Sequence, residues 1–320
     1  MNIPSISIFQ SSNGSVKDRL KLILGAIVYP VQTRRWRSFL LDNPLLGELA
    51  QQYPRIMHKI YRPYLSSHLS CADRVDAMIG HYSHIFKRGF GKLVSQAALG
   101  PIPIAEFAGK SGTLFQINLA GINAGHREGE LMLQLVQDGV CIYTASFALL
   151  NRDAESYIKL GALQGLRSTR GGAQAIKQVT RELHGCRPKN LMVSLVSEIG
   201  AYFGCSMILL VSNKNRITVN GRRSRRISSN YDETWEEMLA SRRRDGNFEL
   251  PCNGLVPKNI DLVPSNKRAE ARRRNALLVS VCAAIRSSLD FWRIPSARLV
   301  AGSDALPASM PLQVKPLKVG

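Results

Sequence analysis

The stretch that decides the fold is Glu130–Leu150, with the sequence ELMLQLVQDGVCIYTASFALL. Its two halves, 130–137 and 140–150, are apolar runs with alternating or β-branched residues, which is typical of strands. Between them lies the pair Asp138-Gly139, the combination that two-residue hairpin turns favour. The stretch therefore predicts an antiparallel hairpin.

Two further runs of the same kind lie on either side of this hairpin. TLFQINLA at 113–120 precedes it and SYIKLGALQ at 156–164 follows it, and Gly, Asn and Asp separate the runs. Such short runs divided by turn residues predict strands that pair with their sequence neighbours. We therefore expect a four-stranded antiparallel meander over residues 113–164.

Helical signals flank the predicted sheet. Residues 16–98 predict a helical section. Within it, 70–86 has apolar residues at the i, i+3, i+4 spacing, and Ser70 or Asp73 could cap the start of this helix. After the sheet the pattern predicts helices at 173–184, 188–203, 231–240 and 266–290, and strands at 206–212 and 248–251. The fold class is therefore α+β: a helical N-terminal section followed by an antiparallel sheet flanked by helices.

Composition divides the chain into three parts. Residues 1–33 form a polar tail and a short amphipathic helix, 34–294 form the main domain, and the Pro-rich 295–320 predicts a disordered tail. The apolar run 22–31 is about half of the ~20 residues that cross a bilayer. Arginines follow it where a signal peptide would have a cleavage site. We expect a cytoplasmic protein, and a peripheral place at the inner membrane surface stays open because cations adjoin the apolar run.

Basic residues dominate the charged side chains. The chain has 43 Lys and Arg against 23 Asp and Glu, a formal net charge of +20. This excess predicts a polyanionic partner: an anionic membrane surface, a phosphorylated glycolipid or nucleic acid. Nucleic acid is the less favoured of these, because few aromatic residues interleave the basic runs. The six cysteines have no CxxC pair, so we expect reduced, mostly buried thiols and no metal site.

Thr180–Lys189, TRELHGCRPK, places cations where one predicted helix ends and the next begins. Lys189 in the first turn of the second helix opposes the helix dipole, and Arg187 lies beside it. A bound phosphate or carboxylate would supply the missing negative charge. The alternative is that both side chains reach back to the open carbonyls of the preceding helix.

The segment LGALQGLRSTRGG, 160–172, has the layout of a phosphate-binding loop, in which a strand ends and a Gly-rich turn leads into a helix. Its candidate cofactor-binding residues, together with Arg187 and Lys189, are Gln164, Gly165, Arg167, Arg170 and Gly171. The order of elements is similar to that of the GCN5-related (GNAT) acyltransferases. That likeness would imply a coenzyme A thioester and an N-acyltransferase, should the protein be an enzyme. The loop does not meet their consensus, so a simple glycine-rich connection stays open.

Acid–base candidates are few. His184 lies at a helix end, where a positive imidazolium is stabilised, and it could act as a base if 164–172 folds over it. Glu130 begins a strand and could form a paired carboxylate site with Glu128, whereas a solvated strand end is the plainer interpretation. Two clusters predict polyanion binding: Arg222, Arg223, Arg225 and Arg226 in a loop, and Lys267, Arg268 and Arg272 at the start of the last helix.

Seven blocks together resemble the VirK/YbjX family of enterobacterial proteins. They are DRVDAMIGHY (73–82), REGELMLQL (127–135), IYTASF (142–147), LGALQG (160–165), TRELHGCRPKNLM (180–192), YDETWEEM (231–238) and KRAEARRRNALL (267–278). The resemblance covers about residues 34–292. It implies a virulence-associated protein of the Gram-negative envelope, linked to surface-protein presentation and export, outer-membrane or lipid A remodelling and antimicrobial-peptide resistance. It implies no catalytic residues.

Overall fold

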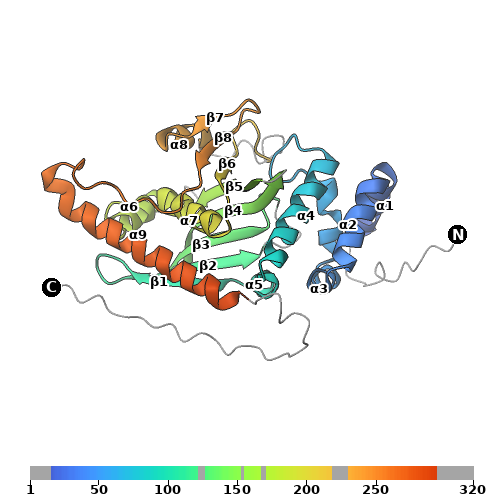
Figure 1. Ribbon diagram of the computed structural model, residues 1–320, viewed down its shortest axis with the longest axis horizontal. Helices are drawn as coiled ribbons and strands as arrows, with labels where there is room; N and C mark the ends of the chain where they lie inside the picture. The colour runs from blue at the N-terminus through green and yellow to red at the C-terminus, as the bar shows by residue number, and fades with distance from the viewer. Residues whose placement is uncertain (1–15, 122–126, 153–154, 167–170, 218–229, 294–320) are drawn as a thin grey trace.

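A mixed sheet forms the centre of the molecule (Figure 1). The computed structural model describes residues 16–121, 127–152, 155–166, 171–217 and 230–293. Within them, eight strands lie in the order β1-β2-β3-β4-β5-β6-β8-β7. Their bounds are Ile102–Ala108 (β1), Leu114–Gly121 (β2), Leu131–Gln137 (β3), Val140–Arg152 (β4), Glu155–Gly165 (β5), Met207–Leu210 (β6), Ser241–Arg242 (β7) and Phe248–Pro251 (β8). Helices flank the sheet, which confirms the α+β class.

The predicted hairpin is confirmed in detail. Strands β3 and β4 pair antiparallel, with Gln137 opposite Val140. Asp138 has a φ of 50° and Gly139 a φ of 75°. Two successive positive φ values define the turn whose twist matches that of the strands, which is why Asp-Gly is favoured here.

The meander has five strands, so the prediction of four is wrong by one. Strand β1 pairs antiparallel with β2 at the edge of the sheet, and its register shifts between Pro103 and Ala105. Pro101 and Pro103 are not typical of a strand, because proline cannot donate to a ladder. An edge strand with a bulge accommodates proline, since one row of its backbone groups has no strand partner.

The helical N-terminal section is confirmed, and Figure 1 shows it gathered at one end of the sheet. It contains α1 (Val16–Val28), α2 (Pro30–Leu41), α3 (Pro44–Gln52), the 3₁₀ helix η2 (Pro54–Tyr61), α4 (Cys71–Lys87) and α5 (Gly91–Leu99). Proline occupies the first position of α2, α3 and η2, where its missing N–H costs nothing. Ser70 caps α4 and forms a reciprocal capping box with Asp73.

After β5 the chain forms two helices and then returns to the sheet. Helices α6 (Gly172–Glu182) and α7 (Pro188–Tyr202) lead into β6, which pairs parallel with β5. Helix α8 (Tyr231–Glu237) is capped by Asn230, whose side chain accepts the Glu233 N–H. Helix α9 (Ser265–Trp292) contacts β1 and α7 and crosses in front of the sheet in Figure 1.

Both faces of β4 are covered in its second half. Residues 145–150 are all buried, whereas a strand with one solvent face would expose every second side chain. Helices α4 and α7 both contact this strand. The buried apolar side chains form one continuous core that runs from Trp36 to Leu289.

Candidate functional site

Two glycines bring the chain before β3 into close contact with the sheet. Ser146 lies opposite Ala162 and Phe147 opposite Leu160, so Gly161 is a bulged residue of β5. A Cβ on Gly161 would lie 1.9 Å from the carbonyl oxygen of Glu128. A Cβ on Gly129 would lie 2.5 Å from the carbonyl oxygen of Phe147. Because neither glycine has a side chain, the chain at 128–129 can pass close to β4 and β5, and this places Glu130 directly before β3.

Glu130 lies at the centre of a buried polar group, which we call the Glu130 cluster: Lys59, Tyr64, His81, Tyr82 and Glu130. The Glu130 side chain is 1% exposed, and its Oε1 lies 2.6 Å from Nζ of the equally buried Lys59. The hydroxyl of Tyr82 donates to its Oε2 over 2.6 Å. Burial and the neighbouring carboxylate raise the pKa of Tyr82 well above its ordinary value. Glu130 is thus neither a solvated strand end nor the partner of Glu128, because its charge is paired with Lys59.

His81 completes the cluster as a neutral imidazole. Its Nδ1 accepts the backbone N–H of Leu149 over 3.0 Å, which places the ring proton on Nε2. Burial, followed by the nearby positive charge of Lys59, lowers the pKa of His81 to about 3. Nε2 itself has no hydrogen-bond partner among the described residues. The imidazole therefore stays uncharged beside the ion pair at neutral pH.

The Glu130 cluster ties three elements together. Lys59 comes from η2, Tyr82 from α4 and Glu130 from the residue before β3. A buried ion pair of this kind needs good geometry and further hydrogen bonds to offset the loss of hydration. Tyr82 and Lys59 supply one contact to each carboxylate oxygen. The geometry is that of an enclosed structural pair, and a catalytic role for Glu130 stays a prediction.

His184 lies in different surroundings. It follows α6 with a φ of 50°, in the left-handed conformation that usually belongs to glycine at helix ends, and Gly185 follows with 76°. Burial first, and then the charges of Arg273 and Lys110, lower the pKa of His184. The expectation of a stabilised imidazolium is therefore wrong. The groups that act on His184 include no member of the Glu130 cluster, so the two predicted acid–base residues lie in separate environments.

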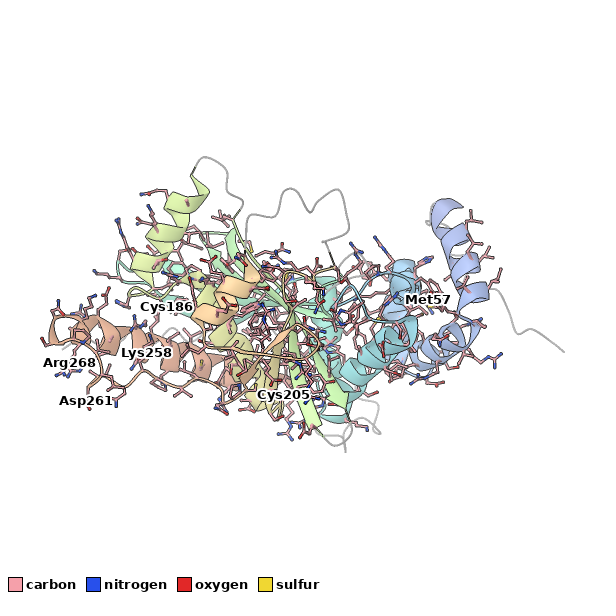
Figure 2. The ribbon with its side chains drawn as sticks, turned by 90° about the horizontal axis from the view of Figure 1, so that it is seen from above. Met57, Cys186, Cys205, Lys258, Asp261 and Arg268 are labelled. Carbon is pink, nitrogen blue, oxygen red and sulfur yellow. The ribbon has the colours of Figure 1, made fainter. Side chains whose placement is uncertain are left out.

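Cations from four segments surround the turn after α6. We call this region the 184–189 surface: residues 184–189 with Lys110, Lys258, Arg273 and Arg274. The positive charges of Lys110 and Arg273 contribute to the lowered pKa of His184. Those of Arg274 and Lys258 favour the thiolate of Cys186, against the effect of its burial. A Cβ on Gly185 would lie 3.8 Å from a guanidinium nitrogen of Arg274. Figure 2 shows Cys186 and Lys258 at the same end of the molecule, close to the start of α9.

Glu237 of α8 neutralises part of this charge. Its Oε2 lies 2.6 Å from Lys189 Nζ and 3.2 Å from an Arg187 nitrogen. The hydrogen bond and charge of Lys189 lower the pKa of Glu237. Arg187 and Lys189 therefore form ion pairs with Glu237 of α8, a later helix. The alternative that they bond carbonyls of the preceding helix is wrong.

Gln164 and Gly165 end β5 and are exposed. Just before them, the Tyr231 hydroxyl accepts the N–H of Leu163 over 2.7 Å and donates to its carbonyl over 2.9 Å. Strand β5 pairs with β6 only as far as Leu160, so this hydroxyl satisfies the next backbone groups of β5 in place of a strand. Gly171 precedes α6 with a φ of 111°. The two arginines of the predicted loop, Arg167 and Arg170, lie outside the described residues.

The two polyanion clusters differ in what the structure describes. Arg222, Arg223, Arg225 and Arg226 lie outside the described residues. Lys267 and Arg272 are exposed in the first turns of α9. Arg268 instead bonds the carbonyls of Val263 and Asp261, where it closes the turn before the helix.

The blocks on which the family resemblance depends meet in space. Tyr82 of 73–82 contacts Glu130 of 127–135. Tyr231 of 231–238 bonds Leu163 of 160–165. The block 180–192 meets 231–238 through Lys189 and Glu237, and a Cβ on Gly185 would lie 3.6 Å from Glu270 in 267–278. No signal in the sequence singles out Lys59, since a lysine in a short helix is usually exposed.

Comparisons with known proteins give one family and a distant structural likeness. The chain is 26% identical to "Uncharacterized protein YbjX" of Escherichia coli (strain K12) over 268 residues, which are 82% of this chain and 81% of that protein. It is 27% identical to an "Uncharacterized protein" of Haemophilus influenzae over 258 residues, 80% of this chain and 84% of that protein.

Among solved structures it is similar to a "cAMP-binding acyltransferase from Mycobacterium smegmatis", with 12% identity, a TM-score of 0.28 and coverage of 68% of this chain and 62% of that chain. The family described as "Protein of unknown function (DUF535)" matches residues 11–287. The chain therefore belongs to the DUF535 family, the family of YbjX, as the seven blocks predicted.

Proposed function

We propose that the protein acts at the Gram-negative envelope by binding a phosphate-bearing ligand, such as the headgroup of a phosphorylated glycolipid or an anionic phospholipid, at the 184–189 surface. The surplus of cations there supports this most directly. Three carboxylates lie in the same region: Glu237 pairs with Arg187 and Lys189, and Glu182 and Glu270 lie near His184. The region has six cations, which are Lys110, Arg187, Lys189, Lys258, Arg273 and Arg274. Glu182 is also the acceptor for the backbone N–H and the hydroxyl of Ser111, so part of its charge is already used.

The geometry of the turn supports the same proposal. Residues from the turn between β1 and β2, the turn between α6 and α7, the segment before α9 and α9 itself converge on His184 and Cys186. Because His184 has a lowered pKa, it can present a neutral ring that donates or accepts a hydrogen bond among fixed cations. The envelope role comes from the family resemblance and is the part that only cellular work can test.

Calorimetric titration with inorganic pyrophosphate and with dispersed lipid A tests the binding. Each Lys or Arg near an anionic surface contributes about 1 kcal/mol, so Lys110→Ala with Arg273→Ala should weaken binding at least about tenfold. The control, Lys87→Ala with Lys92→Ala, changes the charge equally on α4 and α5 and should bind as the wild type does. Equal affinity of the two double variants would refute the site. Binding of lipid A without pyrophosphate would assign the affinity to the acyl chains instead.

A second candidate, an acyl-CoA-dependent N-acyltransferase, is favoured by the parallel pair of β5 and β6. Ligand phosphates bind beyond the carboxyl ends of such strands and at the helix that follows, here α6. Coenzyme A in the same titration discriminates the candidates. Saturable binding lost in Arg167→Ala with Arg170→Ala, but kept in Lys110→Ala with Arg273→Ala, would favour the acyltransferase.

A further inference from the structure

Helix α1 presents an apolar stripe to solvent. Leu20, Ile23, Leu24, Ile27, Val28 and, at the start of α2, Val31 are each between 53% and 70% exposed. Within α1 the spacing of 3, 1, 3 and 1 residues places the first five of them along one face, because a helix repeats every 3.6 residues. In a globular protein such a stripe normally faces the core. Here it faces outward.

The opposite face of α1 attaches the helix to the rest of the protein. Leu22 is buried, and a Cβ on Gly25 would lie 2.6 Å from the ring of Tyr61 in η2. Glycine thus lets the helix backbone approach this ring closely. The side of α1 that contains Leu22 and Gly25 therefore packs on the protein, and the stripe on the other side is left exposed.

The charge of this part of the sequence selects the occupant of the stripe. Residues 16–37 include one acidic residue, Asp18, and six basic residues, of which Arg35 is paired with Asp76 of α4. The other five basic residues are Lys17, Arg19, Lys21, Arg34 and Arg37. A second copy of this chain on the stripe would bring like charges together. A bilayer that contains anionic phospholipids offers both the opposite charge and an apolar interior.

The length of the helix fixes its orientation. Thirteen residues extend about 20 Å, less than the ~30 Å of a bilayer's hydrocarbon core. Among the described residues no helix is long and apolar enough to cross a membrane. An amphipathic helix of this length lies in the interface plane.

We propose that α1 and the start of α2 form a membrane-docking helix, which buries the stripe at the headgroup–acyl boundary of an anionic bilayer. This goes beyond the proposed ligand site. Figure 1 shows α1 and the start of α9, which borders the 184–189 surface, at opposite ends of the molecule.

Sedimentation of the full chain with lipid vesicles tests the docking helix. Wild type should bind vesicles of equal parts phosphatidylglycerol and phosphatidylcholine, and bind phosphatidylcholine vesicles far more weakly. Ile23→Asp with Ile27→Asp should lower the partition coefficient at least about tenfold, since two exposed apolar side chains would become charged. Leu114→Asp with Val140→Asp makes the same charge change at two exposed apolar strand residues and should leave binding unchanged. Circular dichroism should show both variants folded, because all four side chains are exposed.

Three outcomes would overturn the proposal. The first is equal vesicle binding by the two aspartate pairs, and the second is no vesicle binding by the wild type. The third is self-association of the wild type without lipid that Ile23→Asp with Ile27→Asp abolishes. Failure of the ligand site would give a different result. In that case Lys110→Ala with Arg273→Ala would still bind pyrophosphate, and Ile23→Asp with Ile27→Asp would still lose vesicle binding.

Discussion

His81 shows how one buried side chain can set the pH dependence of stability. In the folded protein its pKa is about 3, whereas the ordinary value is 6.5. Between these values the unfolded chain binds a proton that the folded chain does not, so stability falls as the pH drops below 6.5. The loss from this residue should be about 1.4 kcal/mol per pH unit over that window.

Urea unfolding at a series of pH values measures the effect. His81→Gln retains an acceptor for the Leu149 N–H but does not titrate, so its stability should fall less steeply with acid than that of the wild type. The comparison concerns the slopes, because the substitution also changes stability at neutral pH. Parallel slopes for the two proteins would contradict the assignment.

At the residue scale, the sequence predicted which positions have unusual environments, but it did not predict the interactions that these residues make. Glu130 and His184 were both singled out, and both have unusual environments. Their partners, Lys59 and Arg273, come from segments far away in the chain, and no local spacing connects them. The pairing of Lys189 with Glu237 was missed for the same reason, although it resolves the conflict with the helix dipole that the sequence revealed.

The strand β5 illustrates what a single glycine contributes to an element. Gly161→Ala would place a Cβ 1.9 Å from the Glu128 carbonyl oxygen, and a backbone atom has no rotamer by which to move away. We expect a loss of about 1–3 kcal/mol of unfolding free energy, as for other overpacked sites. Gly100→Ala is the matched control because nothing lies within 4 Å of its Cβ, and it should change stability by less than about 0.5 kcal/mol. Denaturant unfolding that ranks the two variants equally would show that the chain does not cross the bulge so closely.

At the element scale, the strands and helices followed from local chemistry. Asp138-Gly139 fixed the central hairpin, and proline marked helix starts. The failure at β1 arose because proline is a local signal, while the edge position that tolerates it is a property of the whole sheet. The parallel partner of β5 could not be read locally either, since two helices separate it from β6.

At the scale of the whole molecule, one core joins the helical section to the sheet but does not include α1. The core includes Leu46 of α3, which is fully buried, and it includes no residue of α1. The first residue of this core along the chain is Trp36. Because the core is continuous, its helices and strands should unfold together.

Removal of residues 1–28 should therefore leave a single cooperative transition. It should cost no more than about 2 kcal/mol, because Leu22 is the one buried apolar side chain described in α1. Leu46→Ala in the full chain should cost about 2–5 kcal/mol, since it leaves a cavity in the core. Truncation of the Leu46 side chain should thus lower the free energy of unfolding more than removal of the whole of α1 does. Urea unfolding followed by tryptophan fluorescence and circular dichroism tests this order, because Trp36 and Trp235 are both buried but lie in different parts of the fold. Separate transitions for the two signals would contradict a single cooperative core. A truncation more costly than Leu46→Ala would place α1 in the core and remove its freedom to dock on a membrane.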